Sequence, residues 1–113
     1  MAGKTDVLRG TLDLMILNAL AGGRMHGYGV VRWIRRTTDE ALLVEDGALY
    51  PALHRLRRRG WITADWGRSE NNRRARYYAL TERGRQRLAS EVRAWTRFSS
   101  ALWKIVDAGA GDG

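Results

Sequence analysis

The chain has 113 residues, 44% hydrophobic and 28% charged, close to the averages for folded globular domains and far from a disordered composition. Twenty Lys and Arg against twelve Asp and Glu give a net charge of +8, which favours a polyanionic partner, above all nucleic acid. The sequence contains no cysteine, which excludes disulfides and thiolate sites and fits a cytoplasmic protein, and we expect neither a signal peptide nor a membrane span.

The first part of the chain predicts two short helices. From Leu8 to Leu20, apolar residues recur at intervals of three and four, the period of an amphipathic helix, and a Gly-Gly pair then ends the pattern. A second helix is expected over residues 26–37, where apolar and arginine residues alternate in blocks. The apolar run 42–44 is compatible with a minimal strand, and Asp46 stands where the N-cap of a third helix is expected.

The third helix, over residues 47–59, is expected to carry the binding surface. Leu49, Leu53 and Leu56 share one face, which we expect to point into a core. A neighbouring stripe combines aromatic, imidazole and guanidinium groups that suit the major groove of DNA: Tyr50, His54, Arg57 and Arg58. Pro51 predicts that this helix begins late or bends in its first turn.

An arginine-rich β-hairpin is predicted next. Residues 61–66 and 76–80 alternate as half-buried strands do, and residues 67–75, GRSENNRRA, supply a turn. Residues 54–76 hold +6 of the net charge of +8, because two acidic residues face eight arginines: Arg55, Arg57, Arg58, Arg59, Arg68, Arg73, Arg74 and Arg76. This clustering predicts phosphate contacts from the hairpin, and the candidates are Arg68, Asn72, Arg73, Arg74 and Arg76.

The last predicted helix, over residues 81–107 with Thr81 as its cap, would be about 40 Å long, too long for so small a core to cover. Its apolar residues form a seam typical of a coiled coil: Leu88, Val92, Trp95, Leu102 and Val106. We therefore expect a twofold homodimer, to which Leu8 and Leu12 of the first helix also contribute. Residues 108–113 are expected to be a disordered tail.

The five tryptophans fall into two groups. Trp33, Trp61 and Trp66 are expected at the core or its edge. Trp95 and Trp103 lie eight residues apart on the dimerisation helix, so both are candidates to line a cavity between subunits where a planar ligand would stack. For Trp103, packing within the interface is the favoured interpretation, and Trp95 is the leading candidate for a ligand contact.

Taken in order, these elements predict a mainly α protein with a small β-hairpin. Residues 1–80 would form a winged helix-turn-helix DNA-binding domain, and residues 81–107 a long C-terminal dimerisation helix. In such a module the third helix enters the major groove and the hairpin contacts adjacent backbone or minor groove. Phosphate contacts would supply most of the affinity, and the candidates for reading base edges are Ala48, Tyr50, His54 and Arg57.

Four blocks between about Gly10 and Thr81 together resemble the PadR-type transcriptional regulators: GTLDLMILNAL, HGYG, DGALYPALHRLRRRGWI and NNRRARYYALTERG. The chain is similar to the compact branch of that family, which has a single short C-terminal helix. The resemblance implies a dimeric repressor that a small, often aromatic ligand releases from its operator. It also implies operator contacts from the wing and from the start of the third helix, at Gly47, Ala48, Tyr50 and Pro51. Ala48 stands where such sequences commonly carry serine or threonine, so it offers DNA no hydroxyl.

Two other functions remain open from the residues: a nonspecific nucleic-acid-associated protein, and a winged-helix module that binds proteins. An enzyme is least favoured, because no nucleophile with a nearby base and no suitable carboxylate pair is evident. His26 and His54 are far apart and no cysteine accompanies them, so we expect neither a metal site nor a cofactor. His26 is instead expected to form a hydrogen bond at the start of the second helix.

Overall fold

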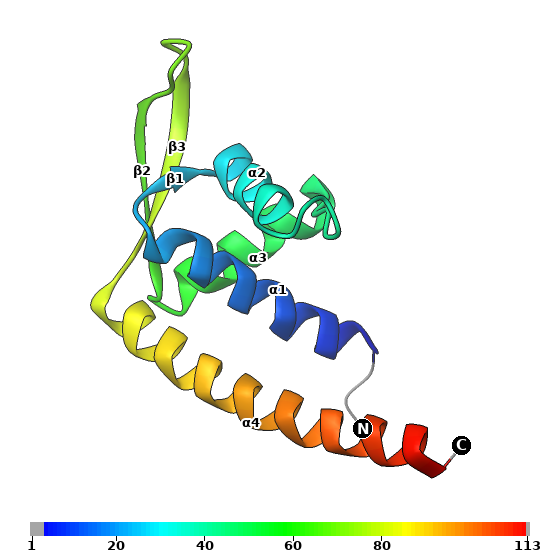
Figure 1. The fold of residues 1–113 in the computed structure, drawn as a ribbon. Helices are drawn as coiled ribbons and strands as arrows, with labels where there is room; N and C mark the ends of the chain where they lie inside the picture. Colours follow the sequence, from blue (N-terminus) through cyan, green and yellow to red (C-terminus); the bar gives the residue numbers. More distant parts are fainter. Residues whose placement is uncertain (1–3, 113) are drawn as a thin grey trace.

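The computed structural model describes residues 4–112, and side chains from residue 10 to residue 111 (Figure 1). Its elements follow in the order α1 (Lys4–Ala21), β1 (Met25–His26), α2 (Gly27–Thr37), α3 (Asp46–Arg58), β2 (Ile62–Arg68), β3 (Arg74–Leu80) and α4 (Glu82–Asp112). The predicted fold class is confirmed: the protein is mainly α, with a winged helix-turn-helix followed by one long C-terminal helix. The division of the chain into two domains stays a prediction.

The hydrophobic core lies where α1, α2 and α3 meet the base of the sheet. The predicted inward face of α3 is confirmed, since Leu49, Leu53 and Leu56 are at most 1% exposed. They pack in one cluster with apolar residues of the other elements: Ile16, Leu17, Leu20, Val30, Ile34, Ile62 and Tyr78. Full burial of each large aliphatic side chain contributes about 1.5–3 kcal/mol, so this cluster holds the three helices together and carries the sheet.

The predicted helix-start role of His26 is confirmed. His26 is the N-cap of α2, and its Nδ1 accepts a hydrogen bond of 2.9 Å from the backbone N–H of Gly29. His26 also belongs to β1, which pairs antiparallel with β3. The sequence suggested a minimal strand at 42–44, but these residues form no strand, because the free edge of β3 is taken by β1 directly after the Gly-Gly turn.

The start of α3 differs from the prediction in two ways. Asp46 is the first residue of the helix rather than its cap, and the N-cap is Glu45, whose side chain forms no capping bond. The Asp46 carboxylate still favours the positive end of the helix dipole. The helix does not begin late, because Pro51 lies inside it. The bond that Pro51 cannot donate would have reached the carbonyl of Gly47, and both residues are exposed to solvent.

The wing is a twisted hairpin that extends beyond the helices (Figure 1). β2 and β3 pair in register from Ile62 opposite Leu80 to Arg68 opposite Arg74, so each strand reaches further toward the turn than the sequence predicted. The sheet order is β1-β3-β2. At the tip, Asn72 adopts φ 57°, a left-handed conformation that asparagine tolerates well.

Thr81 caps α4 as predicted and also ties it to the turn between α3 and β2. Its Oγ1 accepts a hydrogen bond of 3.0 Å from the N–H of Gly84 and donates one of 2.7 Å to the carbonyl of Gly60. Gly84 itself is required by packing, since a Cβ there would lie 2.0 Å from the carbonyl oxygen of Trp61. The first turn of α4 is therefore fixed to the body of the domain.

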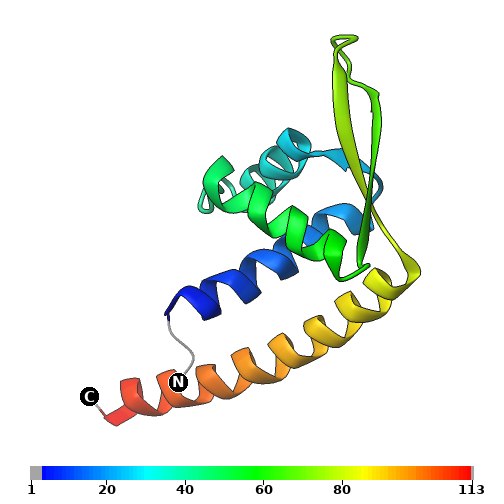
Figure 2. The same cartoon turned by 180° about the vertical axis from the view of Figure 1, so that it is seen from behind.

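From that junction α4 runs alongside α1 (Figure 2). It continues to Asp112, so residues 108–112 are helical where a disordered tail is predicted, and Gly113 lies outside the described residues. Extending an existing helix needs no new nucleus, and Ala108 and Ala110 have the highest helix propensity of any residue type. The molecule is consequently elongated, with a longest dimension of 58 Å.

Candidate nucleic-acid interface

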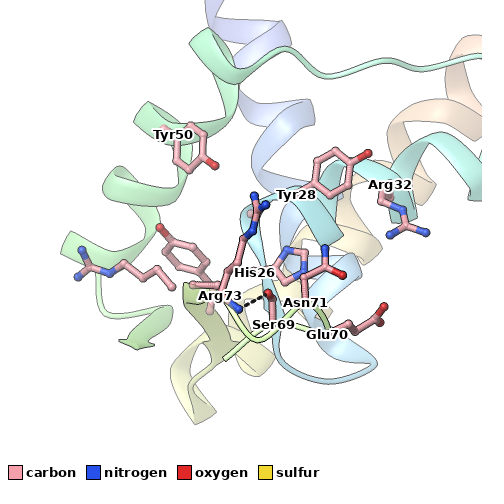
Figure 3. Close-up of a pocket in the computed structure, with 12 residues that line it drawn as sticks. His26, Tyr28, Arg32, Tyr50, Ser69, Glu70, Asn71 and Arg73 are labelled. Atoms are coloured by element: carbon pink, nitrogen blue, oxygen red, sulfur yellow. Dashed lines mark hydrogen bonds between the residues drawn. The ribbon is translucent and has the colours of Figure 1, made fainter. Parts of the chain in front are cut away.

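A cleft of about 460 Å³ opens between the wing, the start of α2 and the start of α3 (Figure 3). β1 and α2 contribute His26, Tyr28 and Arg32, while α3 contributes Tyr50. The turn of the wing supplies residues 69–71 and Arg73, and β3 supplies Ala75, Arg76 and Tyr78. Three of the residues predicted to bind DNA are thus brought together, although they come from two elements distant in sequence: Tyr50, Arg73 and Arg76.

Tyr50 lies on the α3 side of this cleft with half of its surface exposed. Its ring edge rests against Gly27, where an added Cβ would lie 3.1 Å from the phenolic oxygen. Burial, with a smaller contribution from the Asp46 carboxylate, raises the pKa of Tyr50 above its ordinary value of 10.0. The phenol therefore keeps its proton at neutral pH and can donate a hydrogen bond to a phosphate oxygen or a base acceptor.

The lining of the cleft is mostly cationic and aromatic. Arg32, Arg73 and Arg76 face a single carboxylate among the lining residues, that of Glu70. Arg32 stacks over Tyr28 with its guanidinium carbon 5.6 Å from the ring centroid. The Nε of Arg76 is buried and has no hydrogen-bond partner within the described part of the chain. A buried donor without a partner is costly. The three guanidinium groups and the one carboxylate leave the lining of the cleft positively charged.

The prediction that Trp66 lies at the core or its edge is wrong, because 57% of its surface is exposed. Trp66 lies near the wing end of β2, directly opposite Arg76 of β3. Arg74 and Arg76 lie over its ring at 4.3 Å and 5.6 Å from the centroid. This stacking holds two wing guanidinium groups beside each other. Trp33 and Trp61 do pack against the core as predicted.

The other predicted DNA-binding residues are exposed but do not line the cleft: Gly47, Ala48, Pro51, His54, Arg57, Arg58, Arg68, Asn72 and Arg74. They follow the outer surface of α3 and the wing. Sequence reasoning missed His26, Tyr28 and Arg32 as members of the site. The HGYG block marked two of them, but only the pairing of β1 with β3 shows that the start of α2 lies beside the wing.

The predicted dimerisation residues divide between two environments. Leu12 and Leu88 pack against the core of their own chain, and the side chain of Leu8 lies outside the described residues. The outer part of α4 instead exposes a row of large apolar side chains, each at least 40% accessible: Val92, Trp95, Phe98, Leu102, Trp103, Ile105 and Val106. The described part of the chain therefore leaves at least 40% of each of these side chains uncovered.

A second hollow, of about 320 Å³, lies between α1 and α4. Gly10, Thr11 and Leu14 form its α1 side, and Trp95 with Phe98 forms its α4 side, together with Ala94 and the carboxylate of Glu91. The Trp95 and Phe98 rings are 5.7 Å apart. Of the two predicted ligand-binding tryptophans, Trp95 lines this groove and Trp103 does not.

Within residues 4–112, no group of three or more His, Asp or Glu side chains is arranged to hold a metal ion. No helix in the same range combines the length and the apolar character needed to cross a membrane.

The helix-turn-helix, the wing and the cationic cleft between them define a winged-helix DNA-binding protein. The sequence profile described as "Transcriptional regulator PadR-like family" matches residues 16–90. The chain therefore belongs to the PadR-like family of transcriptional regulators: it is a DNA-binding regulator and not an enzyme.

Individual proteins are similar to this chain in sequence or in fold. A transcriptional regulator from Clostridium thermocellum of known structure is 32% identical to this chain. The match covers 88% of this chain and 96% of the regulator, with a TM-score of 0.78. A PadR-like transcription factor from Bacteroides fragilis is 24% identical, covers 90% and 96%, and shares the fold with a TM-score of 0.75. An "uncharacterized protein X" of Lysinibacillus sphaericus is 27% identical over 99 residues, which are 88% of this chain and 91% of that protein.

Proposed function

We propose that the protein is a dimeric, sequence-specific repressor that a small aromatic ligand releases from its operator. The observation that carries the sequence-specific part is the cleft in which Tyr50 of α3 meets Arg73 and Arg76 of the wing. With α3 in a major groove, Arg73 and Arg76 would contact the adjoining backbone, while Tyr50 and Arg57, with Ala48 and His54, would read base edges. Such a regulator acts where the DNA is, which we propose is the cytoplasm.

Dimerisation through α4 is supported by the exposed apolar row on its outer half. Soluble monomers rarely leave so many large apolar side chains together on one surface. A twofold axis through this row would pair identical faces and place two copies of α3 on one side of the dimer. Two recognition helices about 34 Å apart would then reach successive major grooves.

Release by an aromatic ligand is supported by the groove between α1 and α4. Trp95 and Phe98 offer ring faces on which a planar molecule can stack. We propose that Trp95 contacts the ligand and that Trp103 packs in the dimer interface. A ligand that widens the groove would shift the spacing of the two recognition helices and so lower operator affinity. Titration of a planar aromatic dye into wild-type protein and Trp95→Ala tests this, and equal affinities would contradict it.

The decisive experiment for DNA recognition is a footprint on the DNA upstream of the protein's own gene and of its neighbours. We expect a protected site with two related halves, and a preference for it over random duplex of at least ~10³. Binding that weakens steeply with salt but shows no preference would favour a nonspecific nucleic-acid-associated protein. Negligible binding to any duplex at physiological salt would favour a protein-interaction module.

A further inference from the structure

Arg55 behaves differently from the other arginines of α3. Arg57 and Arg58 are exposed, whereas the Arg55 side chain is 22% accessible and points toward α1. There its Nη2 forms an ion pair of 2.5 Å with Oδ1 of Asp13, whose side chain is 14% accessible. Within the described structure, Arg55 therefore contributes to the packing of the helices rather than to the exposed cationic surface.

This ion pair joins two helices through residues 42 positions apart. The other ion pairs found among the described residues are local, one between Arg35 and Glu40 and one within α4. The Nε of Arg55 is buried without a partner, so the guanidinium has little water around it. Breaking such a pair on one side leaves a poorly solvated charge, which proteins tolerate badly.

The pair supplies orientation that the apolar contacts of α3 do not. Leu49, Leu53 and Leu56 hold the helix against the core, but hydrophobic contact is non-directional and permits small rotations. A guanidinium and a carboxylate bind well only in a narrow range of geometries. The contact between Asp13 and Arg55 would therefore narrow the rotation that α3 can adopt, and with it the direction in which Tyr50 and Arg57 point.

The groove between α1 and α4 borders on the same stretch of α1, and there Gly10 and Leu14 face Trp95 of α4. α1 thus lies between the proposed dimer helix and the recognition helix. We propose that Asp13 and Arg55 are positioning residues that fix the orientation of α3 relative to α1 and α4, and so determine which half-site spacing the dimer accepts. This inference rests on the proposed DNA-binding dimer.

The test uses the full chain and duplexes that the wild-type protein selects from a random-sequence pool, followed by a series in which the spacing between half-sites is varied. Asp13→Asn and Arg55→Gln are each expected to lower affinity for the selected duplex roughly tenfold. The slope of log affinity against log salt should stay at its wild-type value, and the spacing preference should broaden. Arg55→Lys should restore part of the preference, and Arg35→Gln, which breaks the exposed ion pair on α2, should change nothing.

A double variant, Asp13→Leu with Arg55→Met, separates positioning from stability. Apolar replacement of both charges commonly preserves or raises stability, so this variant should fold and yet accept several spacings. If it keeps the wild-type preference, the proposal is wrong. It is also wrong if Arg55→Gln alone reduces the salt slope of the dimer by about 1.8, or about 0.9 per subunit, because Arg55 would then bind a phosphate directly. A wild-type protein that selects no duplex would instead overturn the proposed function.

Discussion

At the scale of single residues, two glycines are fixed by atoms from other elements. A Cβ on Gly84 would collide with the backbone carbonyl of Trp61, and one on Gly27 would press on the ring of Tyr50. Both glycines lie in the sequence blocks that resemble the family. Each contact joins residues 23 positions apart, so the reason for each glycine is visible only in the folded chain. His26 was predictable because its hydrogen-bond partner lies three residues away.

Gly84→Ala should destabilise the protein strongly. The neighbour at 2.0 Å is backbone rather than a flexible side chain, so the first turn of α4 would have to move, at a cost of about 1–3 kcal/mol or more. Urea unfolding measures the change. Gly109→Ala on the same helix has open space around its Cβ and should be neutral or stabilise by up to about 1 kcal/mol. Equal effects of the two substitutions would contradict the packing argument.

Gly27→Ala should weaken DNA binding through Tyr50. The added methyl group would push the phenol aside by a few tenths of an ångström, and we expect a loss of affinity of roughly threefold, about 0.7 kcal/mol. Fluorescence anisotropy with a duplex selected by the wild-type protein measures it. In a Tyr50→Ala background the same substitution should cost little further affinity, since its effect passes through the missing ring. Additive losses would mean that Gly27 acts independently of Tyr50.

At the scale of elements, the spacing of apolar residues was sufficient to predict each helix or strand whose own side-chain pattern determines its structure. The helices, the hairpin and the buried face of α3 follow directly from the spacing of apolar residues. Two misjudged features depend on neighbours: β1 pairs with the edge of β3, and Trp66 is exposed because the wing extends beyond the helices. The alternation of apolar and polar residues showed on which face of the strand Trp66 lies. It did not show that no helix covers that face at this position.

The helix and the wing should contribute differently to DNA binding. Arg57→Ala removes an exposed guanidinium on the recognition helix and should relax operator choice, at a cost of about 1–3 kcal/mol for the preferred sequence. Arg74→Ala removes a guanidinium that is stacked on Trp66 and should weaken binding to all duplexes, with a salt slope smaller by about 1.8 for the dimer, or about 0.9 per subunit. Titrations with selected and random duplexes at several salt concentrations separate the two effects. Identical profiles for both variants would refute this division.

At the scale of the whole molecule, the length of α4 determines how the protein can assemble. The helix has 31 residues, about 46 Å at 1.5 Å per residue, and only its first half packs on the domain. The apolar seam alone was enough to predict a long helix whose outer part needs a partner. It did not show that Leu12 and Leu88 serve the core of their own chain, because the same helical period describes packing onto a core and packing onto a partner.

A single charge on the exposed row should therefore decide between dimer and monomer. Leu102 is 45% exposed and lies on the same face of α4 as Trp95, so Leu102→Lys would bury an unpaired ammonium in a dimer interface. We expect monomers by sedimentation at micromolar concentration. Their loss of operator affinity should exceed their loss of affinity for random duplex, because specific binding needs two half-sites. Ser100→Lys adds the same charge to the opposite face and should leave a dimer. Dimers that survive Leu102→Lys would place the twofold contact on another surface.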